Sequence, residues 1–182
     1  MNKRKPLAWL GTLALLPAGF LAASAAIAAE VPDSEQVNKL LSEAKTMAFQ
    51  LKEDAQTMES FNRANVAWEG HVTAINQIKD HVNALGRQVT KLQEVRNSAS
   101  PWQKTAIDRI NPFLSELAGY TDAVIEHVNG QQKHTFDEYK DYLEANADYA
   151  TDLAAMIGNF VDYGKARQRL QTLGDKLEIH ER

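Results

Sequence analysis

Apolar side chains recur every three or four positions along most of this chain, and only an α-helix places residues with that spacing on one face. Four such series follow one another, separated by short polar stretches. Each is long enough for seven or more helical turns. They predict four helices of similar length, near residues 34–61, 66–96, 101–128 and 135–162.

Residues that favour helix ends flank these segments. Asp33 is the expected N-cap of the first helix. Ser100, Pro101 and Gln103 supply a cap, a first helical residue and a capping-box partner for the third. Pro112 must remove one backbone hydrogen bond inside the third helix, but the apolar series keeps its phase across it. We therefore expect one kinked helix there.

Short connections between helices of similar length favour antiparallel neighbours. The expected fold is therefore all-α, an up-down-up-down four-helix bundle with a C-terminal helical extension. The chain has 182 residues and no cysteine. Disulfides, thiolate metal sites and a cysteine nucleophile are thereby excluded.

A further apolar series follows the fourth predicted helix, over residues 163–178. Its members have the spacing of a coiled-coil heptad, but they lie a third to a half of a turn away from the preceding series. Gly158 and Gly164 sit at the junction, so the extension is either a short fifth helix or a continuation of the fourth. This interaction seam either docks back across the bundle end or mediates self-association; we call it the tail seam, and it comprises Tyr163, Ala166, Leu170, Leu173 and Leu177.

The first 28 residues have the pattern of a bacterial-type signal peptide, with a basic start, an apolar centre and small residues at the end. We expect cleavage before Ala29, with a cut after Ala29 or an uncleaved membrane anchor as alternatives. The leader holds three basic residues and no acid, so the mature chain, 29–182, carries a net charge of −7 instead of −4. A periplasmic or secreted protein is expected, with no nucleic-acid partner and no membrane contact after cleavage.

Three histidines are the candidates for a metal site. In an up-down-up-down bundle His71, His127 and His134 fall at the same end, where imidazoles could bind zinc or copper. Met58 is a candidate haem ligand near that end. The alternative is that His71 is a core histidine with a satisfied hydrogen bond and that Met58 fills the core. No histidine has an acid three or four residues before it, which excludes the helical di-iron motif.

Acidic residues form a row on the fourth predicted helix, nearly opposite its apolar face. A row in that position is expected to be a solvated surface. It consists of Asp137, Asp141, Glu144, Asp148 and Asp152.

No nucleophile with its base, phosphate-binding loop or zinc-protease motif is present in the mature chain. We therefore expect a non-enzymatic exported protein, without a cofactor, that acts by binding or assembly, with a homodimer or a protein partner at the tail seam. The alternative is a metal- or haem-binding periplasmic bundle for electron transfer or storage. A periplasmic chaperone is a third possibility.

Overall fold

The computed structural model describes residues 31–131 and 137–178, and this part of the chain is almost entirely helical. The predicted signal peptide, 1–28, lies outside the described residues. The all-α prediction is confirmed. The helices are α1 (Glu35–Ser60), α2 (Trp68–Glu94), α3 (Pro101–Gln131) and α4 (Asp137–Leu177), with single 3-10 turns η1 (Phe61–Arg63) and η2 (Arg96–Ser98).

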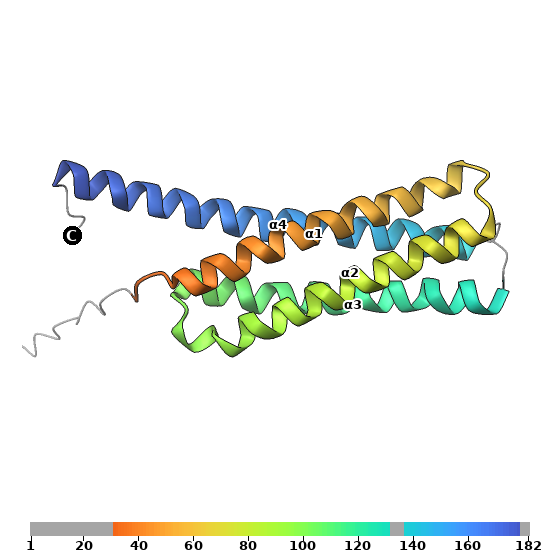
Figure 1. Ribbon diagram of the computed structural model, residues 1–182, viewed down its shortest axis with the longest axis horizontal. Helices are drawn as coiled ribbons and strands as arrows, with labels where there is room; N and C mark the ends of the chain where they lie inside the picture. The colour runs from red at the N-terminus through yellow and green to blue at the C-terminus, as the bar shows by residue number, and fades with distance from the viewer. Residues whose placement is uncertain (1–30, 132–136, 179–182) are drawn as a thin grey trace, which may run out of the picture.

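The helices are arranged as a four-helix bundle in which neighbours in sequence run antiparallel (Figure 1). α1 packs against α2 and α4, and α3 packs against the same two helices. The apolar faces predicted from the sequence meet along the bundle axis. The largest fully buried side chains include members from all four helices: Leu41, Leu51, Met58, Ile78, Leu85, Leu92, Ile107, Ile110, Leu117, Tyr139, Leu143 and Leu153.

The helix ends agree with the predicted ones to within three residues, except that α4 continues to Leu177 and not to residue 162. The prediction that Asp33 caps α1 is wrong, because the hydroxyl of Ser34 accepts the Val37 amide instead, at 3.4 Å. α3 begins at Pro101 as expected, and the Gln103 side chain accepts the Ser100 amide at 3.0 Å. α3 then runs as a single helix through Pro112, ending at Gln131.

α4 is one helix of 41 residues that runs through both Gly158 and Gly164. The alternative of a separate fifth helix is therefore wrong. At 1.5 Å per residue α4 is about 60 Å long, whereas the 26-residue α1 spans about 40 Å. The surplus length extends past the end of the bundle and does not fold back over it (Figure 1).

A buried polar pair joins α3 to α4. Asn146 lies in the core and donates from Nδ2 to the hydroxyl of buried Thr121, at 2.8 Å. From the sequence alone Asn146 is predicted to lie at the edge of the apolar face, because Ala147 can take its place in the apolar series. That prediction is wrong, since Asn146 is buried. Thr121 supplies an acceptor for the buried amide nitrogen, whereas Oδ1 of Asn146 has no hydrogen-bond partner in the described part of the chain.

In the described ranges no helix is both long and apolar enough to cross a membrane.

Candidate functional site

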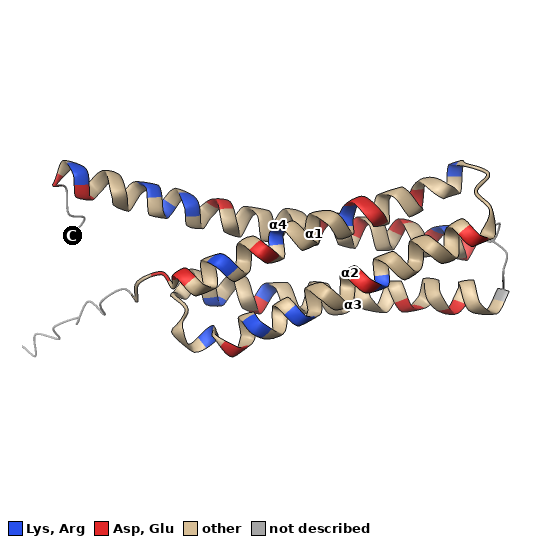
Figure 2. Ribbon diagram, in the orientation of Figure 1, with Lys and Arg blue, Asp and Glu red and all other residues tan. Residues whose placement is uncertain are grey.

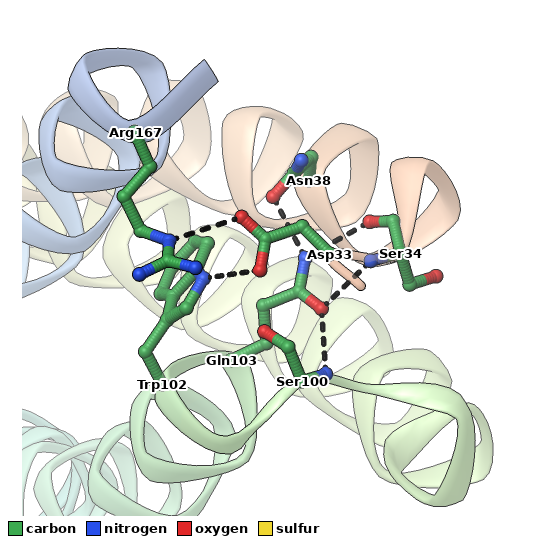
Figure 3. A network of polar contacts seen from close by, with 7 residues as sticks. All are labelled: Asp33, Ser34, Asn38, Ser100, Trp102, Gln103 and Arg167. Atoms are coloured by element: carbon green, nitrogen blue, oxygen red, sulfur yellow. Dashed lines mark hydrogen bonds and ion pairs between the residues drawn. The ribbon is translucent and has the colours of Figure 1, made fainter. Parts of the chain in front are cut away.

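The point where α4 leaves the bundle is held by Asp33, which precedes α1. The Asp33 carboxylate accepts a hydrogen bond from Trp102 Nε1 at 2.6 Å (Figure 3). Its second oxygen pairs with Arg167 Nε of α4 at 3.5 Å. One carboxylate thus connects the start of α1 and the start of α3 to the last turns of α4 that contact the bundle.

Gln103 makes further hydrogen bonds at the same junction of α1 and α3, inside the bundle. Its Oε1 atom accepts the amides of Ser34 and Ser100, each at 3.0 Å. Its Nε2 atom donates to the Ser34 carbonyl at 2.9 Å and to Asn38 Oδ1 at 2.8 Å (Figure 3). A fully buried amide with four partners fixes α1 against α3. The tail of α4 therefore leaves the bundle at a point where α1 and α3 are held together by the contacts of Asp33 and Gln103.

Beyond this corner the tail seam is exposed. Leu170 is 69% exposed, Leu177 65%, Leu173 48% and Tyr163 47%, and Ala166 is exposed as well. Three leucines at heptad spacing on one side of a projecting helix form an apolar surface of the kind that marks an interaction site. The heptad pattern of the sequence located this surface, but the structure is needed to show that nothing in the described chain covers it.

A shallow groove between α3 and α4 adjoins the tail seam. It has a volume of about 600 Å³, and Tyr163 belongs to both surfaces. The Trp102 and Tyr163 rings meet edge to face, 5.3 Å apart, and the guanidinium of Arg109 lies 6.0 Å from the centre of the Phe160 ring. We call this surface the α3/α4 groove; it is lined by Trp102, Thr105, Arg109, Phe113, Asp152, Ala155, Met156, Asn159, Phe160 and Tyr163.

The sequence alone did not reveal this groove. Its α4 residues are exposed or half-buried positions beside the buried face of that helix, and its α3 residues lie about 50 positions earlier. Only the packing of α3 against α4 brings the two sets together.

Two of the three candidate metal ligands meet at the opposite end of the bundle. His71 is buried, and its Nδ1 lies 2.8 Å from the hydroxyl of Tyr139. The ring of His127 stacks on Tyr139 with centroids 4.6 Å apart. His134 lies outside the described residues. His71 and His127 thus flank one phenol, that of Tyr139.

The surroundings of Tyr139 are aromatic as well as polar. The rings of Phe61 and Trp68 pack against His71, with centroid distances of 5.1 and 5.8 Å. Burial raises the pKa of Tyr139, so its hydroxyl stays protonated at neutral pH. The arrangement closes the end of the core around a neutral phenol.

No group of three His, Cys, Asp or Glu side chains suited to a metal ion occurs within the described ranges, which exclude His134. Met58 is fully buried among the core residues. Metal or haem binding at this end therefore stays a prediction that rests on the sequence.

The acidic row of α4 faces solvent along its whole length, as predicted. Of its members, Asp137 forms an ion pair with Lys140 at 3.2 Å. The row and the tail seam occupy overlapping sectors of the helix, with centres roughly 20° apart by helical arithmetic. The outer side of α4 is thus acidic over the bundle and apolar beyond it.

Comparison with known proteins gives no match: no family model fits the chain, and no curated protein or solved structure is significantly similar to it.

Proposed function

We propose that this chain is an exported, non-enzymatic assembly protein that forms a homodimer through the tail seam. The observation that carries the proposal is the exposure of Leu170, Leu173 and Leu177 on a helix that projects from the bundle. The signal-peptide pattern of residues 1–28 supports export to the periplasm or medium. The absence of catalytic motifs in the mature sequence favours binding over catalysis.

The way the tail is anchored supports a role in association. A free helix of about 15 residues is marginally stable in water, because nucleation is costly. Here the tail continues a helix that is already formed, and Asp33 holds its base through Arg167, while Gln103 holds α1 against α3 beside it. Little conformational entropy is lost when such a preordered seam meets a partner.

Leucine burial supplies the driving force. Removing a fully exposed leucine side chain from water contributes roughly 1.5–3 kcal/mol. A symmetric dimer that buries both tail seams covers three leucines from each copy, and a reciprocal contact of this kind is what a twofold dimer requires.

The proposal is tested by placing charge on the seam of the mature chain. The variant Leu170→Glu/Leu173→Glu should sediment as a monomer at concentrations where the natural chain is a dimer. The matched control, Gln171→Glu/Thr172→Glu, adds the same charge to the same two turns but away from the seam. It should remain dimeric.

Circular dichroism of both variants checks that they keep their helices. A monomeric natural chain, or a dimer that survives both substitutions equally, would refute the proposal.

A further inference from the structure

We infer that the tail of one copy runs antiparallel to α4 of a second copy and docks in that copy's α3/α4 groove, and that the exchange is reciprocal. This inference rests on the homodimer proposed above and specifies where each tail lies. It follows from the continuity of one face of α4, from the length of the seam, and from the distribution of charge along the helix.

The tail seam and the groove form one continuous stripe on α4. Every seventh residue from the second turn of α4 to its end is aromatic or apolar, and none of these side chains is fully buried. The last three belong to the tail seam, and the earlier ones lie on the side of α4 that meets α3. The residues are Tyr142, Tyr149, Met156, Tyr163, Leu170 and Leu177.

The tail seam by itself is too short for two copies to form a stable coiled coil through it alone. From Tyr163 to Leu177 it covers two heptads, whereas a recognisable coiled coil sustains three to four. Two tails that contacted only each other would leave the aromatic groove uncovered. Contact that continues into the groove lengthens the interface along the stripe already described.

Charge along α4 is strongly polarised (Figure 2). The stretch over the bundle, 137–162, has seven acidic residues and one lysine, Lys140. The stretch beyond it, 163–178, has four basic residues and two acidic ones. Parallel pairing would place each acidic row beside its counterpart, Asp152 beside Asp152. Antiparallel pairing instead places each basic tail along the acidic stretch of the other copy, which is attractive at both ends.

The charged residues that flank the tail seam favour one antiparallel alignment of the two α4 helices over another. If the two tails paired only with each other, Arg169 would face Arg169 of the second copy, because antiparallel helices pair equivalent flanking positions. A shift of one heptad towards the bundle places Arg169 opposite Asp162 of the second copy, and this contact occurs twice. Asp162 already pairs with Lys45 of its own chain at 2.9 Å, but its side chain stays 65% exposed, so Arg169 joins an existing ion pair there. The same shift brings Leu173 against Met156 in the groove.

The groove suits a leucine-bearing helix. Its walls are the rings of Trp102, Phe113 and Phe160, which offer large apolar faces. Met156 is unbranched and adapts its shape to an incoming side chain. Arg169 and Lys176 of the tail, like Asp152 at the groove, form no ion pair within the described chain and can pair across copies.

Cross-linking tests this arrangement directly, because the natural chain has no cysteine and each introduced thiol is unique. Mature chains carrying Met156→Cys and Leu173→Cys are mixed, exchanged and treated with a short bismaleimide. We expect cross-links between the two variants. Leu173→Cys alone should react poorly with itself, because the two positions are about 25 Å apart along the helix in this register. Lys91→Cys, on α2, is the exposed control.

Sedimentation of the same samples separates the two proposals. A dimer in which Leu173→Cys links efficiently to itself would overturn groove docking and leave the homodimer intact, since that is the result of parallel pairing. A dimer without a link between positions 156 and 173 would likewise overturn groove docking. A monomer would overturn both proposals.

Discussion

At the scale of single residues, Gly164 determines how closely α4 crosses Trp102. A β-carbon at Gly164 would lie 2.7 Å from Cη2 of that ring, and the ring is held by its hydrogen bond to Asp33. Neither the α4 backbone at Gly164 nor the Trp102 ring can move away without breaking the contacts of Asp33 that anchor the tail. The sequence identifies Gly164 only as a junction, since its neighbour across the bundle is about 60 residues away.

We predict that Gly164→Ala destabilises the chain by about 1–3 kcal/mol through this clash. The result is diagnostic because alanine is otherwise favoured over glycine in a helix by roughly 1 kcal/mol. Gly119→Ala is the matched control, because no atom lies within 4 Å of its added carbon. It should be neutral or stabilising. Urea unfolding at one protein concentration measures both, and equal stabilities would contradict the account of Gly164.

Tyr139 gives a prediction with a pH dependence. Replacing it by phenylalanine removes the partner of His71 Nδ1 in a buried setting, and we expect a loss of about 1–2 kcal/mol at pH 7. Because burial raises the pKa of Tyr139 in the folded chain, its contribution is complete below about pH 10, where the unfolded phenol ionises. That contribution is lost as the pH rises further.

The stability of the natural chain should therefore fall more steeply above pH 10 than that of Tyr139→Phe, and the difference between them should narrow. Urea unfolding between pH 7 and 11 tests this. A constant difference across that range would show that the phenol is not protected from ionisation.

At the scale of elements, the extent and order of the helices follow from apolar spacing and end signals, because these are local properties of the chain. Ser100, Pro101 and Gln103 place the start of α3 correctly for that reason. Asp33 and Asn146 were misplaced because their partners are distant in sequence: Trp102 and Arg167 for the first, Thr121 for the second. Local patterns carry no information about such partners.

The Asn146–Thr121 contact between α4 and α3 can be tested by a pair of variants. Thr121→Val removes the hydroxyl that accepts from Asn146 Nδ2, and leaving a buried amide without that partner should cost about 1–3 kcal/mol. Adding Asn146→Leu should recover most of the loss, because an apolar pair of similar size leaves nothing unsatisfied. If urea unfolds the double variant as easily as Thr121→Val alone, then the loss of the Asn146–Thr121 hydrogen bond is not what destabilises Thr121→Val.

At the scale of the whole molecule, the four-helix architecture was predictable and the α3/α4 groove was not. Short loops and four similar apolar series dictate an antiparallel bundle whatever the details of packing. The groove depends on which margins of two helices face each other, and this is settled only when α3 and α4 pack. The tail seam was visible in the sequence because its heptads belong to a stretch that the bundle does not use.

In the proposed dimer α4 has two parts, one that completes the bundle and one that joins it to another copy. The contacts of Asp33 with Trp102 and Arg167 link the two parts, since they hold α1 and α3 together and fix the base of the tail. Substitutions in the core should therefore lower the free energy of unfolding, whereas substitutions on the tail seam should change association and leave the fold of each copy intact.

The most direct test is native mass spectrometry of the mature chain, recovered from the periplasm or medium of a host supplied with iron, zinc and copper. We predict a dimer of unmodified mass, converted to a monomer by truncation after Gln168, which retains the Gly164 and Arg167 contacts. A monomer would contradict the assembly role. An added mass of haem or metal that disappears with His71→Ala or His127→Ala would assign the protein instead to cofactor binding at the opposite end of the bundle.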